Sequence, residues 1–374
     1  MKIVQMRVRK SPKFDYILFS AMILLVIVGI VMVYSASNYS AKLQYGDECF
    51  YLKKQIMGVC VGLVACLGCY FLDYNKLNKI KWPLAIASGV LLCLVFIPGL
   101  GSSKYGATRW VNLGFTTIQP SEFAKFALIV FSAGWMSKNA EKVKTFRGIL
   151  PVIILGGIYC VLIILEPNMS ITMCVGLLLI FMLFIGGASK KHLLLILLPL
   201  LIAVPLLIVI EPYRMKRLLA FLDPWSEASS VGYQLVQSLY ALGAGGVFGV
   251  GLFNSRQKYL FLPFAESDFI FSIIGEELGF VGCLLIISIF AILVWRIVKI
   301  ACNSTTRFGS LLASGIASII SIQVLLNIAV VTGSIPPTGL PLPFISAGST
   351  SLLVFMSAIG IVLNVDRQSR KSKI

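Results

Sequence analysis

The sequence predicts an all-α polytopic membrane protein that forms a single membrane domain over residues 1–374. Hydrophobic residues make up 58% of the chain and charged residues only 13%, and the mean hydropathy is +0.93. Soluble globular domains carry about twice that share of charge. Ten apolar runs are each long enough to cross a bilayer, which takes about 17–25 residues. These observations together predict ten transmembrane helices.

The ten expected helices are separated by polar or glycine-rich connections, and they cover residues 15–37, 54–72, 82–98, 120–136, 148–165, 170–188, 193–210, 267–295, 309–332 and 346–364. The first has too long an apolar run for a cleavable signal peptide, so we expect a retained anchor. The fourth begins Gln119-Pro120, and proline favours the first helical position. The last outer connection, 333–351, contains four prolines. Nonhelical backbone beside a membrane core indicates the wall of an aqueous cavity.

The orientation of the helices follows from the rule that basic residues stay in the cytoplasm. With the N-terminus inside, the inner segments hold 21 of the 32 basic residues, including those of the N-terminus (1–14) and the tail (365–374). Both termini are therefore expected in the cytoplasm. This bias and attraction to anionic membrane lipids account for the net charge of +17, so the charge does not indicate nucleic-acid binding.

His192 is the single histidine of the chain. A Ser-His-Asp triad, a two-histidine zinc site and bis-histidine haem ligation are therefore excluded. No metal site is predicted from the residues. An acid or base on the outer side is expected to be a carboxylate, with Lys or Tyr as the alternatives.

A long outer loop, residues 211–266, joins the seventh and eighth spans and is the largest soluble part of the chain. A loop of this length in a compact protein is usually functional. Its cations Arg214, Lys216 and Arg217, with Arg256 and Lys258 further on, offer charge-assisted hydrogen bonds to phosphate. Ordinary contact with lipid headgroups would explain the same cluster.

The eighth span carries three acids, Asp268, Glu276 and Glu277, and carboxylates at membrane depth are costly enough to suggest a site. At 100° per residue, Glu276 lies about 80° around the helix from Asp268 and Glu277 about 180°. We therefore expect Glu276 to line the lower part of a site, and Glu277 to pair with another span or to face a different cavity. Structural pairing is the alternative interpretation of both acids. Asp268 has an alternative interpretation as a first-turn acid that follows Ser267 as N-cap.

The fourth span holds a second polar pair, Glu122 and Lys125, three residues apart. Three-residue spacing allows them to pair on one helix face. Glu122 also suits a capping box at the helix start. Either a site or local capping explains these residues.

Several blocks of the sequence resemble one family, the SEDS proteins of shape, elongation, division and sporulation. The blocks are Gly106-Ala107-Thr108-Arg109-Trp110, Gln119-Pro120-Ser121-Glu122-Phe123-Ala124-Lys125, Phe221-Leu222-Asp223-Pro224-Trp225, Gly232-Tyr233-Gln234, Gln237-Ser238-Leu239, Ser255-Arg256-Gln257-Lys258, Asp268-Phe269-Ile270-Phe271, Gly275-Glu276-Glu277-Leu278-Gly279 and Thr338-Gly339-Leu340-Pro341-Leu342-Pro343-Phe344-Ile345-Ser346. The resemblance covers nearly the whole chain. The segment 32–37 is more similar to the FtsW and SpoVE branch than to RodA.

This resemblance implies a peptidoglycan glycosyltransferase that polymerises lipid II, an undecaprenyl-diphosphate-linked disaccharide peptide, on the outer face of the bacterial cytoplasmic membrane during division or sporulation. It implies a class B penicillin-binding protein as transpeptidase partner, together with other division or elongation machinery. A divalent cation, Mg or Mn, or the loop cations would compensate the diphosphate charge.

The resemblance also implies which residues form the site. Asp268 corresponds to the family's catalytic aspartate and would act as general base. Residues expected to bind substrate or line the cavity are Arg109, Trp110, Glu122, Lys125, Arg214, Gln234, Gln237, Ser238, Lys258, Glu276 and Ser346.

The chain departs from the family pattern at several positions. Phe264 stands where many members have Glu, with an acid displaced to Glu266, and Asn168 replaces an Asp. These departures leave open a divergent or regulated member of the family. A second class of function also stays open, a transporter of lipid II or another amphiphile with Glu122, Lys125 and Glu276 as its polar lining. The absence of an evident inverted repeat of broken helices disfavours transport.

Overall fold

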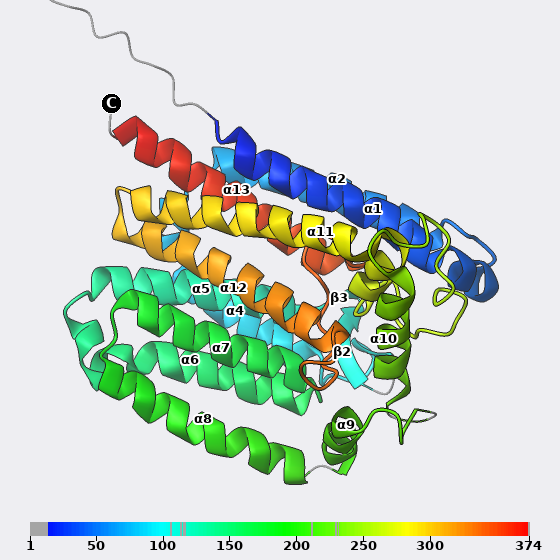
Figure 1. The fold of residues 1–374 in the computed structure, drawn as a ribbon. Coiled ribbons are helices and arrows are strands. Elements are labelled where there is room, and N and C mark those ends of the chain that lie inside the picture. The colour runs from blue at the N-terminus through cyan, green and yellow to red at the C-terminus, as the bar shows by residue number, and fades with distance from the viewer. Residues whose placement is uncertain are drawn as a thin grey trace, which may run out of the picture.

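The computed structural model describes residues 14–104, 107–112, 114, 117–210, 212–228, 230 and 232–372. Most of them are helical (Figure 1). Ten helices coincide with the ten expected spans: α1 (Tyr16–Tyr45), α2 (Phe50–Phe71), α4 (Lys81–Leu94), α5 (Pro120–Lys138), α6 (Phe146–Leu165), α7 (Met169–Gly186), α8 (Lys190–Ile210), α11 (Ile270–Asn303), α12 (Arg307–Val331) and α13 (Ser349–Ser372).

Seven of these helices, as described, are long and apolar enough to cross a membrane: α1, α2, α6, α7, α11, α12 and α13. Helix α4 is shorter, with 14 residues. The count of ten membrane crossings therefore stays a prediction. Polar side chains cap several helix starts, as when Asn168 accepts a hydrogen bond from the backbone N–H of Ile171 at 3.3 Å.

The helices form a bundle in which α5 and α12 lie between two outer groups (Figure 1). Helices α1, α2 and α13 lie on one side, and α6, α7 and α8 on the other. In the most apolar windows of α12 and α13, 61% and 67% of residues are buried, against 28% in α2 and in α11. Helices α12 and α13 therefore supply the protein core, whereas α2 and α11 keep broad apolar faces exposed, as membrane-facing helices do.

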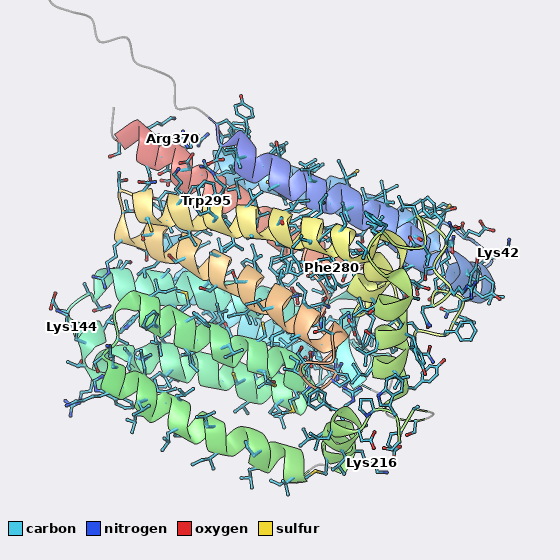
Figure 2. The ribbon with its side chains drawn as sticks, viewed as in Figure 1. Lys42, Lys144, Lys216, Phe280, Trp295 and Arg370 are labelled. Atoms are coloured by element: carbon cyan, nitrogen blue, oxygen red, sulfur yellow. The ribbon has the colours of Figure 1, made fainter. Side chains whose placement is uncertain are left out.

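The two ends of the bundle separate residues that are predicted to lie on opposite sides of the membrane. Figure 2 shows Lys144 and Arg370, both predicted to be cytoplasmic, at one end. Lys42 and Lys216, both predicted to be outside, lie at the other end. The basic N-terminus 1–13 lies outside the described residues, and the expected tail continues α13 as helix to Ser372.

The structure corrects the all-α prediction in one place. Between α4 and α5 the chain forms a small antiparallel sheet in the order β1-β2-β3, with β1 (Gly101–Lys104), β2 (Ala107–Asn112) and β3 (Thr117–Ile118). Two shorter helices join α2 to α4 and α5 to α6, namely α3 (Asn75–Lys79) and a 3-10 turn (Lys142–Lys144). The sheet lies at the end of the bundle that carries Lys216 (Figures 1 and 2).

The outer loop 211–266 is also more ordered than its composition suggests. It contains α9 (Pro212–Leu222) and α10 (Tyr233–Gly245), so the first part of the glycine-rich stretch 232–251 is helical. The rest of that stretch docks onto a break in α11 at Gly279, where φ is 67°. There the N–H of Val250 donates to the carbonyl of Glu276 at 2.9 Å, and the N–H of Phe280 donates to the carbonyl of Gly246 at 2.9 Å. The loop thereby satisfies backbone groups that the broken helix leaves open.

Candidate functional site

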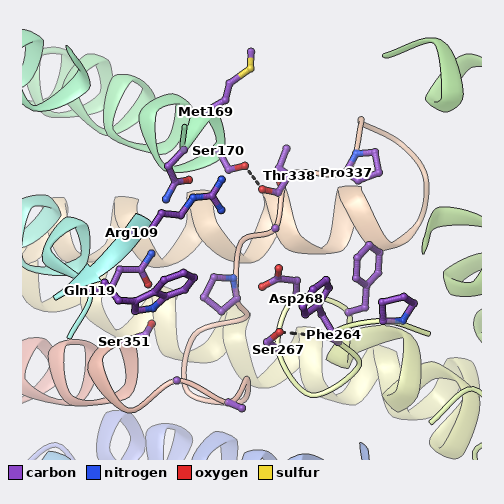
Figure 3. A pocket seen from close by; sticks show the side chains of 18 of the residues that line it. Arg109, Gln119, Met169, Ser170, Phe264, Ser267, Asp268, Pro337, Thr338 and Ser351 are labelled. Carbon is purple, nitrogen blue, oxygen red and sulfur yellow. Dashed lines mark hydrogen bonds between the residues drawn. The ribbon is translucent and has the colours of Figure 1, made fainter. Parts of the chain in front are cut away.

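A large cavity of about 1860 Å³ lies at the end of the bundle that carries the sheet, α9 and α10 (Figures 1 and 3). Segments far apart in sequence form its wall. They include the starts of α2 and α7, strand β2, parts of α9 and α10, residues 263–269 and the proline-rich connection between α12 and α13. The prediction that this connection forms a cavity wall is confirmed, since Pro336, Pro337 and Pro341 all line it.

The charge on the wall is unequal. Among the described lining residues there are three cations, Lys54, Arg109 and Arg217, and one acid, Asp268. In Figure 3 the side chains of Arg109 and Asp268 extend into the same space from different segments. A cavity with this balance suits an anionic ligand that must also meet one carboxylate.

Asp268 stands just before α11 and not within it. The helix begins at Ile270 and its N-cap is Phe269, so the interpretation of Asp268 as a first-turn acid capped by Ser267 is wrong. Burial raises the pKa of Asp268 to about 6, and the carboxylate of Glu266 adds to this increase, whereas Arg109 and Arg217 oppose it. A carboxyl group with such a pKa is a competent base near neutral pH.

Two side chains hold the main chain at Asp268. Asn327, from α12, donates through Nδ2 to the carbonyl of Asp268 at 2.8 Å and to the carbonyl of Leu340 at 2.7 Å. Ser346 donates through Oγ to the carbonyl of Ser267 at 2.6 Å. The aspartate is therefore fixed to α12 and to the proline-rich connection at the same time.

Gly339 approaches the carboxylate of Asp268 from the same connection. Its φ is 70°, and a Cβ built there would lie 3.0 Å from Oδ2 of Asp268. Nearby, the N–H of Ala347 donates to the carbonyl of Glu266 at 2.9 Å. Burial raises the pKa of Glu266, whose side chain is not among the described cavity-lining groups.

The two arginines are held by backbone carbonyls. Strand β2 presents Arg109, which donates through Nε to the carbonyl of Glu166 at 3.5 Å and through Nη2 to the carbonyl of Pro167. Helix α9 presents Arg217, which donates through Nη1 to the carbonyl of Pro337 at 3.2 Å. These contacts orient both guanidinium groups at the wall.

A second cavity, of about 380 Å³, lies behind this wall at the outer end of α4. It contains Glu166, which is 1% exposed and whose two carboxyl oxygens have no hydrogen-bond partner in the described part of the chain. Burial raises the pKa of Glu166 to about 8, against the opposing effect of Arg109. Glu166 is therefore neutral near pH 7.

Glu122 and Lys125 do not line the large cavity as described, contrary to expectation. They form a fully buried ion pair of 2.7 Å, and Nζ of Lys125 also donates to Oε1 of Gln323 on α12 at 2.8 Å. Since Pro120 begins α5 and the structure shows no side-chain cap at Gln119, the capping-box interpretation of Glu122 is not supported either. The pair joins α5 to α12 inside the bundle.

Glu276 likewise is not among the described lining residues, so its expected place in the cavity is wrong. It accepts hydrogen bonds from Ser255 and from the N–H of Arg256 at 2.8 Å. Glu277 accepts from Ser35 of α1 at 2.6 Å, which confirms that it pairs with another span, and lies 3.7 Å from Nζ of Lys258. These two acids anchor the segment 255–258 to the broken helix.

The remaining predicted residues divide in the same way. Trp110 and Gln234 line the cavity. The other predicted residues outside the described lining are Gln237, Ser238, Lys258 and Ser346. Ser238 is buried and donates to the carbonyl of Val331 at 2.7 Å. Helix α9 carries Arg214, but its side chain lies outside the described residues.

Sequence reasoning missed two residues of the site. Lys54 was predicted only as the start of a span, and it lines the cavity. Asn327 is a buried amide in an apolar helix. A polar side chain in a membrane helix is itself a signal for a site or a partner.

The described residues do not fit a metal held by the protein alone. They include no group of three or more His, Cys, Asp or Glu residues able to hold an ion. The cavity contributes one carboxylate from its described lining. The expected divalent cation therefore stays a prediction, and no step below depends on it.

Comparison with known proteins gives a consistent result. A family described as "Cell cycle protein", that of FtsW, RodA and SpoVE, matches residues 15–371. Stage V sporulation protein E of Bacillus subtilis is 40% identical over 366 residues, covering 97% of this chain and 99% of that protein. A probable peptidoglycan glycosyltransferase FtsW of Trichlorobacter lovleyi is 41% identical over 360 residues, covering 95% and 94%.

Two solved structures share the fold. A chain from a peptidoglycan synthase complex, described as coordinating polymerization and crosslinking, aligns with a TM-score of 0.80 and 28% identity, covering 95% of this chain and 98% of that one. The rod shape determining protein RodA of Thermus thermophilus aligns with a TM-score of 0.69 and 26% identity, covering 95% and 97%.

Proposed function

The chain belongs to the FtsW, RodA and SpoVE family, and from that membership we propose that it is a peptidoglycan glycosyltransferase in which Asp268 is the general base. The observation that carries the assignment of the base is the composition of the cavity wall. Asp268 is the one acid among the described lining residues, which also include three cations.

In the proposed reaction the three cations stabilise the negative charge of the leaving group. A lipid-linked sugar donor carries a diphosphate, which bears negative charge throughout the reaction and more as the glycosidic bond breaks. Arg109 and Arg217 have their guanidinium groups oriented by backbone carbonyls, and Lys54 adds a third charge. Such prearranged cations stabilise developing charge without reorganising during the reaction.

In the proposed reaction Asp268 activates the nucleophile by accepting its proton. The 4-hydroxyl oxygen of one sugar attacks the anomeric carbon of the other, its proton passes to the carboxylate of Asp268, and the electron pair of the breaking C–O bond goes to the lipid diphosphate. A single displacement of this kind inverts the anomeric centre and needs one carboxylate. With a pKa of about 6, Asp268 is ionised at neutral pH and still basic enough to accept the proton.

The substrate and partner follow from the same proposal. The protein is a multi-pass protein of the bacterial cytoplasmic membrane. The cavity lies at the end predicted to face outward, where lipid II would present its sugars, and the cavity exceeds the usual 300–1,000 Å³ or so of a small-ligand pocket. A class B penicillin-binding protein is the proposed partner, supported by the likeness to a complex that couples polymerization and crosslinking.

The transporter alternative has lost its main support. That hypothesis needs Glu122, Lys125 and Glu276 as a polar path through the protein. All three side chains are buried, with Glu122 and Lys125 paired to each other and Glu276 hydrogen-bonded to Ser255. None of the three is among the described lining residues of the cavity.

The proposal is tested by polymerisation of labelled lipid II by the purified chain, alone and with its transpeptidase partner. We expect glycan from the wild type and none from Asp268→Asn. Asp223→Asn is the matched control, because Asp223 belongs to the same outer loop and lies outside the described cavity wall. Full activity of Asp268→Asn would refute the role of the base. Movement of lipid II between vesicle leaflets without any polymer would refute the enzyme.

A further inference from the structure

We propose that Asn327 is a positioning residue that holds Asp268 in the orientation needed for proton transfer. This inference rests on the proposed function, because it assigns a role relative to the base. Asn327 does not line the cavity as described, so it acts through Asp268 and not on the substrate.

The geometry places Asn327 at a junction of three segments. It is 1% exposed on α12, and its single amide nitrogen bridges the carbonyls of Asp268 and Leu340. Leu340 directly follows Gly339, where an added Cβ would lie 3.0 Å from Oδ2 of Asp268. One side chain therefore fixes the main chain of the base and the part of the wall next to its carboxylate.

Asp268 needs such support because it lies outside regular structure. Helix α11 starts two residues later, and the preceding turn contains Phe264 with φ of 59°. Ser346 donates a hydrogen bond to the carbonyl of the preceding residue, Ser267. Two consecutive carbonyls of the nonhelical segment that carries the base are therefore held by side chains. A base on an unsupported turn would sample orientations in which its carboxylate misses the hydroxyl.

The side chain of Asn327 leaves one buried acceptor without a hydrogen bond within the described part of the chain, which is unfavourable for stability. Both donor bonds are made, but Oδ1 has no hydrogen-bond partner among the described residues. Burying an unsatisfied acceptor is unfavourable, and such a group in a native structure calls for a reason. Orientation of Asp268 supplies that reason.

The test compares Asn327→Leu with a matched substitution at the other end of the bundle. Asn364 is also a fully buried asparagine, and its Nδ2 donates to the carbonyl of Tyr70 while its Oδ1 accepts from the N–H of Tyr74. Asn364→Leu removes comparable hydrogen bonds far from the cavity. Both variants are assayed as full chains with the transpeptidase partner, beside the wild type and Asp268→Asn.

We expect Asn327→Leu to lower kcat about 100-fold, as a displacement of about 1 Å can, with KM for lipid II unchanged. Asn364→Leu should keep both constants in the folded fraction. If Asn327→Leu does not fold, Asn327→Ser, too short to reach either carbonyl, gives the same comparison.

Equal kcat values for the folded Asn327 and Asn364 variants would overturn the inference, as would a change confined to KM. The proposed function fails separately. If the wild type makes no polymer, or Asp268→Asn stays active, the role of the base is wrong whatever the Asn327 variants do.

Discussion

Asp268→Asn should make the protein more stable while abolishing its activity. Burial raises the pKa of Asp268 from 3.8 to about 6, so the folded protein holds this carboxylate in an unfavourable charged state at neutral pH. The neutral form of Asp268 therefore contributes fully to the free energy of unfolding below pH 3.8. This contribution is lost as the pH rises from 3.8 through about 6. Asparagine mimics the neutral form and avoids this loss.

The expected magnitude follows from the difference between the two pKa values. Each pKa unit corresponds to about 1.4 kcal/mol, so the gain at pH 8 is about 3 kcal/mol and at pH 5 about half of that. The side chain of Asp268 is only partly buried, so these values are upper bounds. A gain of this size corresponds to several degrees in the midpoint of thermal unfolding.

The assay is thermal unfolding of the purified chain in detergent at pH 5 and pH 8, with Asp223→Asn as the control. Asp268→Asn should raise the midpoint at both values, more at pH 8, whereas the control should show no such pH-dependent gain. A lower midpoint for Asp268→Asn at pH 8, or an equal change at pH 5 and pH 8, would refute the argument that the folded protein disfavours the ionised form of Asp268.

Three further substitutions test other parts of the structure. Glu166→Gln should leave stability unchanged near pH 4 and raise it at pH 7 and at pH 9, because the folded pKa of about 8 lies above the ordinary value of 4.5 and the unfolded chain is already ionised at pH 7; an unfolding midpoint that is unchanged or lower at pH 7 and pH 9 would contradict this. Glu122→Gln should destabilise the chain by about 3–5 kcal/mol by leaving Lys125 buried without its partner, and adding Lys125→Met should recover part of this in denaturation experiments; no recovery would argue against the pair. Gly249→Ala should prevent folding, because φ is +82° and the new Cβ would lie 2.1 Å from the carbonyl oxygen of Glu277, whereas Gly243→Ala meets nothing within 4 Å and should express normally; equal yields of folded protein would contradict the docking at the helix break.

The helices were predictable because membrane helices leave a strong local signal. Each long apolar run became a helix, and the errors lay at the helix ends, as for α1, which continues eight residues beyond the predicted end, to Tyr45. The sheet was not predictable in the same way. Its strands contain four, six and two residues, and a bulge between Ser102 and Ser103 breaks the alternation that would mark a strand.

The site was predictable only in part because its contacts are not local. An acid at the edge of a span signals either a site or a partner, and the sequence does not show the partner. Gln323, which completes the environment of Lys125, lies 198 residues away, and Ser35 lies 242 residues from Glu277. Asn327 is 59 residues from Asp268, so the contact that holds the base had no sequence signal beyond a polar side chain in an apolar helix.

The most direct test of the central claim is the pH dependence of kcat/KM for lipid II polymerisation. With Asp268 as general base, kcat/KM should rise with pH through a midpoint of about 6 and then level off, since the free enzyme must be ionised at this residue. Asp268→Glu should keep an acid limb with a displaced midpoint. A wild-type profile that is flat between pH 5 and pH 8, or an acid limb that persists unchanged in Asp268→Glu, would contradict the assignment of Asp268 as the base.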